Sequence, residues 1–114
     1  MGYTDTSKDA ALDGIGSAAT YISFHTSNPG STGTAEVAGG SYARVQTTWG
    51  AASVSSKAGS QIISNIPAST TITFWGLWTA VSGGAFHYGG ALLASESFGG
   101  AGTYTFTPTL TASG

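Results

Sequence analysis

The side chains that could carry acid–base catalysis are scarce in this chain. Glu36 and Glu96 are the only carboxylates after residue 17, and a glycoside hydrolase would need both of them at one site. Nothing in the sequence brings these two residues together. His25 and His87 match no metal-ligand spacing, so each is expected to be a strand residue with a hydrogen-bonded ring. The sequence therefore predicts neither catalytic residues nor a metal site.

Nucleophiles and cofactor-binding loops lead to the same expectation. The chain has no cysteine, which removes disulfides, thiolate catalysis and cysteine-based zinc sites and leaves the redox compartment open. Its many serines include no Gly-x-Ser-x-Gly nucleophile elbow. The segment from Gly14 to Ala19 matches the loose dinucleotide-binding pattern G-x-G-x-x-A, but it follows no predicted strand. We therefore expect no cofactor and no enzymatic activity.

A second group of residues indicates an architectural role. A tight turn is favoured by Asn28-Pro29-Gly30, and Gly39-Gly40 permits positive φ angles where the loop ends. Glu36 and Arg44 are the only opposite charges in this region, so a charge-assisted, bidentate bond could hold the loop. In full solvent such a pair would contribute about 1 kcal/mol or less. The predicted structural motif consists of Asn28, Pro29, Gly30, Glu36, Gly39, Gly40, Tyr42 and Arg44.

Three tryptophans, Trp49, Trp75 and Trp78, are candidates for contact with a ligand. Aromatic rings that are exposed on a sheet face can stack on the C–H faces of sugars. The alternative is that at least two of the three rings fill the core. Trp75 and Trp78 are three residues apart, which places them on opposite faces of a regular strand unless Gly76 marks a bulge.

The elements that position these residues are predicted to be β-strands. Alternating polar and apolar residues, together with β-branched and aromatic runs, indicate six strands separated by Gly, Ser, Asn and Pro turns. On the first strand Ile22 and Phe24 share one face, and Ser23 and His25 share the other. Such strands favour an all-β fold, either a single antiparallel β-sandwich or a small jelly-roll-like barrel. The predicted strands are residues 20–26, 42–49, 60–66, 70–78, 86–93 and 103–110.

Residues 1–17 are predicted to form a short N-terminal arm, and residues 18–114 the β-sandwich domain. The only helix-like stretch runs from Asp9 to Asp13, where Thr6 or Ser7 could cap a single short turn. The arm could fray, as chain termini commonly do, or it could become ordered against a neighbouring subunit.

Composition limits both the core and the kinds of partner. Of 114 residues only 20 are Leu, Ile, Val or Phe, enough for one domain with a thin core. Charged residues make up 7% of the chain, against roughly 25% in ordinary soluble domains, and the formal net charge is -2. Such a surface favours self-association or coverage by other subunits. Three scattered basic residues argue against nucleic-acid binding, no apolar run is long enough for a membrane span, and nothing marks the chain for secretion.

The loop motif has a counterpart among phage proteins. The segment from His25 to Arg44 follows the pattern HT-x-x-PG-x-x-G-x-x-E-x-x-GG-x-YAR. It resembles the signature of small virion proteins of tailed phages, especially those that infect actinobacteria. Proteins of this kind are described as capsid decoration, minor tail or tail-fibre proteins. Extended to Trp49, the resemblance covers about a fifth of the chain.

The resemblance implies a non-enzymatic virion structural protein, made in the host cytoplasm and located on the particle surface. Fibres usually contain long repeats or coiled coils, and this short chain has neither. We therefore expect a capsid decoration or minor capsid protein on the head shell. The alternatives are a minor tail or tail-fibre-tip protein and a glycan-binding β-sandwich. Expected partners are the major capsid protein or tail proteins, and further copies of the chain, with a trimer favoured and neither nucleic acid nor membrane involved.

Overall fold

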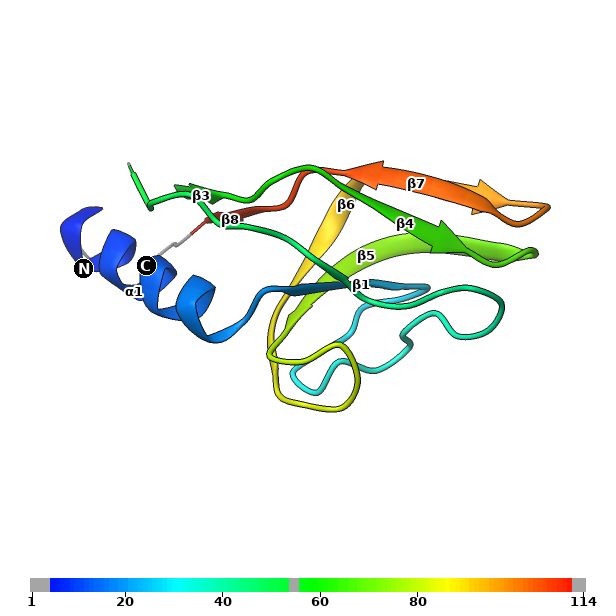
Figure 1. Ribbon diagram of the computed structural model, residues 1–114, viewed down its shortest axis with the longest axis horizontal. Coiled ribbons are helices and arrows are strands. Elements are labelled where there is room, and N and C mark those ends of the chain that lie inside the picture. Colours follow the sequence, from blue (N-terminus) through cyan, green and yellow to red (C-terminus); the bar gives the residue numbers. More distant parts are fainter. Residues whose placement is uncertain (1–4, 54–55, 112–114) are drawn as a thin grey trace.

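The computed structural model describes residues 5–53 and 56–111, and the molecule measures 45 × 23 × 23 Å (Figure 1). These residues form one helix, α1 (Asp5–Ala18), and eight strands. The strands are β1 (Tyr21–His25), β2 (Val45–Gln46), β3 (Ser56–Ala58), β4 (Ile62–Ile66), β5 (Thr70–Trp78), β6 (Phe86–Phe98), β7 (Gly102–Phe106) and β8 (Thr109–Thr111).

Antiparallel sheets make up the body of the molecule. The main sheet has four strands in the order β2-β1-β5-β6. The pair β4–β7 forms the layer above it in Figure 1, and β3–β8 continues that layer toward α1. A hydrogen bond from Gly59 N to Pro108 O (2.9 Å) joins the two halves of this layer. The predicted all-β antiparallel sandwich is therefore confirmed.

The core lies between these two layers and is built around aromatic rings. Phe24 of β1 and Trp75 of β5 lie opposite each other in register. Both rings contact Phe106 of β7, with centroids 5.5 and 5.4 Å away, and Tyr104 lies 5.3 Å from Phe24. The buried cluster comprises Leu12, Ala19, Ile22, Phe24, Val37, Ile62, Ile66, Ile72, Trp75, Leu77 and Leu110.

The other face of the main sheet is covered by a loop. Ser23 and His25 alternate with Ile22 and Phe24 along β1, so they point away from the aromatic core, as predicted. They are nevertheless fully buried, because the segment 26–44 passes beneath the sheet in Figure 1. A hydrogen bond from Val37 N to Phe24 O (2.9 Å) fastens this loop along the edge of β1 beyond β2. The main sheet thus has a covered face on each side.

β6 is the outer strand of the main sheet and contains a large bulge. Glu96 pairs with Ile72 and Ala91 pairs with Phe74, so the four residues 92–95 lie opposite Thr73 alone. Bulges of this kind bend a strand and interrupt its hydrogen-bond ladder. The Thr73 hydroxyl is buried without a hydrogen-bond partner at this point, and the Leu93 side chain is fully exposed at 109%.

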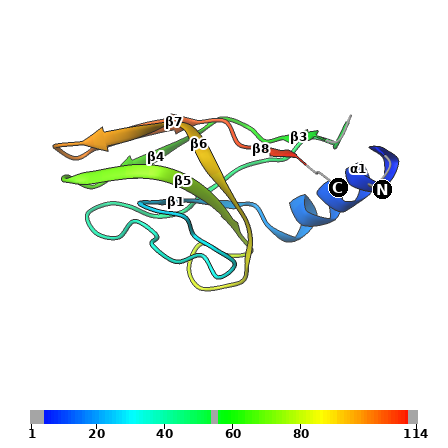
Figure 2. The same cartoon turned by 180° about the vertical axis from the view of Figure 1, so that it is seen from behind.

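The two sides of the sandwich are built differently. On one side β2 contacts β4, which brings the two layers together. On the opposite side β6 and β7 are the outer strands, and they are not paired with each other. Figure 2 shows this side, with β6 crossing in front of β5. The apolar side chains that close the core there are only half-buried: Tyr88, Leu92, Phe98, Tyr104 and Phe106.

The helix α1 is longer than the single turn that the sequence indicated. Gly14 and Gly16 lower its intrinsic helix propensity, but contacts with the body compensate. Leu12 is buried in the core, and Asp13 Oδ1 accepts hydrogen bonds from Lys57 Nζ (2.7 Å) and Ala52 N (2.9 Å). Among the described residues no helix has the length and apolar character needed to cross a membrane.

Strand boundaries differ from prediction where side chains replace the ladder. The predicted strand 42–49 shrinks to Val45–Gln46, since Thr47 Oγ1 donates to Ser60 O (2.8 Å) and Thr48 N donates to Ser60 Oγ (3.0 Å). The predicted strand 103–110 is divided into β7 and β8 at Pro108, which lacks an N–H for the ladder. β6 runs five residues beyond its predicted end, and β3 was not predicted.

Candidate functional site

The turn at the start of the loop forms as its sequence indicates. Asn28 Oδ1 accepts a hydrogen bond from Gly30 N (2.9 Å), and Gly30 has a positive φ of 63°. Pro29 is fully buried, and its carbonyl accepts hydrogen bonds from Gly33 N (3.0 Å) and Thr34 N (3.1 Å). This turn reverses the chain beneath the main sheet.

The Gly39-Gly40 pair forms the exit of the loop. Both glycines have positive φ angles, 107° and 56°, which other residues rarely adopt. The carbonyl of Gly39 accepts a hydrogen bond from Tyr42 N (3.2 Å). The bend therefore delivers Tyr42 and Arg44 back toward Glu36.

Glu36 and Arg44 form the bidentate ion pair that the sequence suggested. Arg44 Nη2 donates to Glu36 Oε1 (2.8 Å), and Arg44 Nε donates to Oε2 (2.9 Å). The two side chains are only 8% and 21% exposed, respectively. The pair is thus largely withdrawn from solvent. Its bidentate geometry fixes the relative position of the two side chains more strictly than an exposed surface pair would.

Arg44 also reaches the turn between β5 and β6. Its Nη1 donates to the carbonyls of Ala80 (3.0 Å) and Gly83 (2.8 Å), and its guanidinium lies 3.6 Å from the ring centroid of Trp78. Stacking on an aromatic face and a planar fork of donors are properties of arginine that lysine lacks. Arg44 consequently connects three separate parts of the chain.

Tyr42 completes this arrangement on the side of β1. Its hydroxyl donates to Glu36 Oε2 (2.8 Å) and accepts from Phe24 N (3.2 Å). Burial and the neighbouring Glu36 raise the pKa of Tyr42, so it remains a donor. Burial alone would raise the pKa of Glu36, but hydrogen bonds from Arg44 and Tyr42 outweigh it and hold that pKa below its usual value.

Ser23, His25 and Trp78 form a buried chain of hydrogen bonds. The sequence predicted a strand residue with a hydrogen-bonded ring at His25, but it did not predict the partners of that ring. Trp78 Nε1 donates to Ser23 Oγ (2.8 Å), which lies 2.6 Å from His25 Nε2, and His25 Nδ1 lies 2.7 Å from Thr34 O. Because the Thr34 carbonyl can only accept, the ring carries its proton on Nδ1 and Nε2 accepts from Ser23. The sequence does contain part of this arrangement, since a Ser-x-His segment on one strand places both side chains on the same face of the sheet.

A Ser–His pair at this distance has the geometry of a nucleophile and its base, but its surroundings differ from those of an active site. Both side chains are fully buried beneath the loop, so a substrate cannot reach Ser23. Burial lowers the pKa of His25 and keeps the ring neutral. The chain of hydrogen bonds satisfies buried polar groups and fixes the loop against the sheet.

The three tryptophans are used internally to different degrees. Trp75 lies in the aromatic core, and Trp78 lies on the loop side of the sheet against Phe86, with centroids 5.1 Å apart. Trp49 is half-buried, and its Nε1 donates to Ala19 O (3.0 Å). Trp75 and Trp78, at 4% and 9% exposure, leave no open ring face for a sugar to stack on.

The other candidate reactive groups remain separate. Glu36 is bound by Arg44 and Tyr42, whereas Glu96 lies on β6 opposite Ile72. His87 is exposed on β6, while His25 is buried. In the part of the chain that the structure describes, no three His, Cys, Asp or Glu side chains gather in a way that could hold a metal ion.

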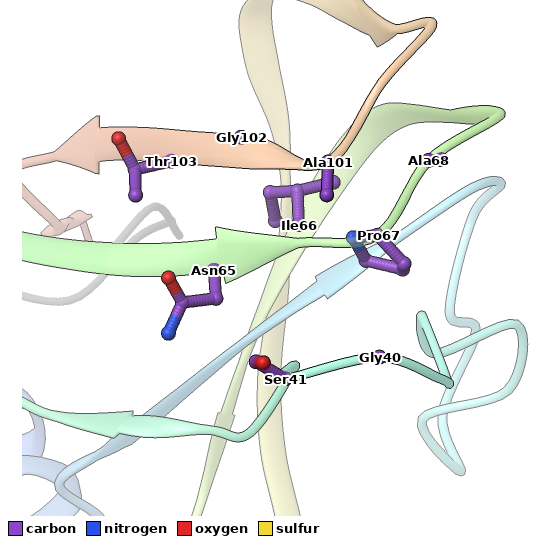
Figure 3. Close-up of a pocket in the computed structure, with 9 residues that line it drawn as sticks. All are labelled: Gly40, Ser41, Asn65, Ile66, Pro67, Ala68, Ala101, Gly102 and Thr103. Atoms are coloured by element: carbon purple, nitrogen blue, oxygen red, sulfur yellow. The ribbon is translucent and has the colours of Figure 1, made fainter.

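A surface hollow of about 630 Å³ lies at the end of the molecule opposite α1 (Figure 3). Figure 3 shows that three segments meet there: the bend at Gly40-Ser41, the end of β4 at Ile66-Pro67, and the β6–β7 turn at Ala101. None of its lining residues carries a charge. The hollow therefore has no group suited to acid–base or metal chemistry.

Comparison with known protein families shows the family to which this chain belongs. The family described as "Podophage GP4 fiber I protein gp80" matches residues 10–111, a span that reaches from α1 to β8. The chain belongs to this family. The comparison with curated proteins gives no match. The family confirms the coarse prediction of a phage virion structural protein, and its description names a fibre. It therefore supports the tail-fibre alternative better than the expected capsid decoration protein.

Proposed function

We propose that this chain is a non-enzymatic structural module of a phage tail fibre, located at the surface of the particle. The observation that carries the proposal is the family match over residues 10–111. That span includes all eight strands, so the whole sandwich is the unit that the fibre family shares. The absence of long repeats, which favoured a head location, loses its force once a fibre can include compact modules of this kind.

The geometry is suited to a rigid building block. The body is twice as long as it is wide, at 45 × 23 × 23 Å. Its longest loop is fixed to the sheet by Arg44, Tyr42 and the Ser23–His25 chain of hydrogen bonds. Buried, hydrogen-bonded polar networks of this kind favour one defined conformation. A fibre module has to keep its shape under load, and a loop that is fixed to the sheet in this way makes the module stiffer.

The partners in this proposal are other fibre or tail proteins together with further copies of the chain, as a trimer. The low charge content supports it, because a domain with 7% charged residues and a net charge of -2 has little electrostatic resistance to close packing. The surfaces involved carry hydroxyls, glycines and apolar groups, and their binding would depend on shape more than on ion pairs.

Labelling of phage particles tests the proposed location. A short peptide tag can be inserted at Gly100, where the β6–β7 turn is exposed and no other group lies close. Gold-conjugated antibody against the tag should label the fibres of particles that carry this insertion, and untagged particles should stay unlabelled. Labelling distributed over the head shell would overturn the proposal and favour the capsid decoration interpretation.

A further inference from the structure

The flap, which we define as residues 26–35, begins directly after His25, the last residue of β1 (cyan in Figure 1). It is bonded within itself, since Pro29 O accepts from Gly33 N (3.0 Å) and Thr34 N (3.1 Å). In the part of the chain that the structure describes, its one hydrogen bond to a strand joins His25 Nδ1 to Thr34 O (2.7 Å). The His25 ring is therefore the polar attachment of the flap to the main sheet.

Apolar contacts complete this attachment. A Cβ added to Gly33 would lie 2.6 Å from Cη2 of Trp78, so the backbone of the flap rests directly on the indole. A Cβ added to Gly89 of β6 would lie 2.6 Å from Cγ of Pro29, which is fully buried. The flap and the sheet are thus packed closely together, and the chain of hydrogen bonds around His25 lies between them.

The hydrogen bonds of His25 fit only the neutral ring. Nδ1 donates to Thr34 O, and Nε2 accepts from the hydroxyl of Ser23, whose oxygen accepts from Trp78 Nε1. A proton on Nε2 would remove the acceptor of the Ser23 hydroxyl. The β5 side leaves no space for a water molecule there, because even a Cβ added to Gly76 would lie 2.7 Å from Nε2. Protonation would therefore leave a buried donor unpaired beside a buried charge, which is costly.

The charged groups near the ring do not compensate for this cost. Burial is the main influence on the pKa of His25 and lowers it, despite the bond to the flap carbonyl. From the loop, Glu36 favours the charged ring and Arg44 opposes it, and these two side chains are paired with each other. β5 contains no charged residue. On β6, Phe86 lies 6.1 Å from the ring between centroids, and its neighbour His87 is exposed.

The flap is the part of this cover that can move. β5 is an inner strand of the main sheet and is paired on both sides, whereas the flap belongs to no sheet. At the end of the flap Ala35 has a positive φ of 62°, which residues other than glycine rarely adopt. Glu36, the next residue, is held by Arg44. Lifting of the flap would let Ala35 leave this backbone conformation and would admit water to His25.

We propose that the flap is an acid-sensitive device: protonation of the His25 ring releases residues 26–35 from the main sheet, while the sandwich and the pair of Glu36 and Arg44 stay in place. Opening hydrates the charged ring and exposes the indole of Trp78. Because the exposed ring has the ordinary histidine pKa of 6.5, the opening equilibrium constant rises as the pH falls below 6.5. The inference goes beyond the proposed fibre function and does not rest on it.

Hydrogen exchange of the intact chain, followed by NMR without denaturant, tests the flap. The probe is the indole N–H of Trp78, which is bonded to Ser23 beneath the flap. After correction for the exchange rate of free tryptophan at each pH, its opening constant should rise by up to about tenfold from pH 7.5 to 5.5. It should also exceed the opening constant of the slowest β5 amides, which report global unfolding, by about tenfold or more.

Three variants identify the group responsible. His25→Gln keeps a donor and an acceptor but cannot become charged, so exchange at Trp78 should lose its pH dependence after the same correction. His87→Gln is the matched control, since His87 is exposed on β6, and it should keep the dependence of the wild type. Gly33→Ala crowds the Trp78 ring and should speed exchange at both pH values while their ratio stays the same.

Three results would each contradict the flap. The first is an opening constant at Trp78 that does not change with pH. The second is an opening constant equal to that of the β5 amides, which would mean that only global unfolding exposes the indole. The third is a pH dependence that persists in His25→Gln. The first two are measured on the wild type and need no variant to fold. Gold labelling at Gly100 is independent of all three, so this inference and the fibre assignment fail separately.

Discussion

The guanidinium of Arg44 lies 3.6 Å from the ring centroid of Trp78 while it holds both carboxylate oxygens of Glu36. A strand residue, a loop carboxylate and the β5–β6 turn are thereby joined at a single side chain. Planarity is essential, since the same group presents its edge to Glu36 and its face to the indole. The structure of the loop therefore depends on an arginine at this position.

Arg44→Lys should lower the free energy of unfolding by about 2 kcal/mol, although the charge is retained. A lysine ammonium cannot make the bidentate bond and also reach the carbonyls of Ala80 and Gly83. Urea unfolding monitored by tryptophan fluorescence measures the change. Glu96→Gln, at an exposed site, is the control and should alter stability by less than about 0.5 kcal/mol. Equal stability of the wild type and Arg44→Lys would contradict this account of the loop.

Stability should decrease as the pH falls below the unfolded-state pKa of histidine, 6.5. Burial lowers the pKa of His25 in the folded state, so between the two pKa values the unfolded chain binds a proton that the folded chain does not. The expected slope approaches about 1.4 kcal/mol per pH unit for this one group. Urea unfolding between pH 7.5 and 5 measures it, above the range in which Glu36 titrates.

His87→Gln is the matched variant for this pH dependence, because His87 is exposed on β6. It should retain the slope, and His25→Gln should remove it. NMR titration of the His25 ring in the wild type gives a second measurement that does not depend on a variant folding. A stability that is flat over this range, or a His25 ring that titrates like a free histidine, is the opposite of what burial requires.

Gly76→Ala should destabilise the protein by about 1–3 kcal/mol through crowding. An added Cβ would lie 2.5 Å from Ser23 Oγ and 2.7 Å from His25 Nε2, in the centre of the buried chain of hydrogen bonds. Thermal unfolding measures the loss. Gly100→Ala is the matched substitution, since nothing lies near its added methyl group, and it should leave the melting temperature almost unchanged. Similar melting temperatures for the two variants would refute the crowding argument.

Asp13→Ala should loosen α1 without unfolding the sandwich. It removes the partner of Lys57, which is 7% exposed, and leaves the hydrogen bond donor of Ala52 unpaired. Hydrogen–deuterium exchange should become faster in α1 and stay unchanged in β4 and β5. Exchange in α1 that equals the wild type would mean that Leu12 alone holds the helix.

The strand that sequence reasoning predicted best is β5, which lies between two other strands of the main sheet. The predicted strand 70–78 matches Thr70–Trp78 in both boundaries, because this segment is rich in β-branched and aromatic residues. The alternation of Ile22 and Phe24 with Ser23 and His25 was also predicted. The burial of Ser23 and His25 was not predicted, because the local sequence pattern does not show that residues 26–44 fold over them.

The predictions made for residues outside the main sheet were poorer for identifiable reasons. The helix α1 is stabilised by Leu12 and by the bond between Asp13 and Lys57, a contact between residues far apart in sequence. The pair of Glu36 and Arg44 was predicted because its members are close in sequence and are the local opposite charges. No local sequence pattern indicates where in the virion the protein lies, and the fibre location is proposed from the family description.

The bulge in β6 has a consequence for how a protein so rich in strands and so poor in charge avoids unlimited growth. A flat, uninterrupted outer strand of thirteen residues would be a template for endless stacking of chains into an amyloid-like ribbon. The four extra residues at 92–95 divide that template into two short pieces that no straight strand can follow. A neighbouring chain therefore cannot extend the sheet along the whole length of β6.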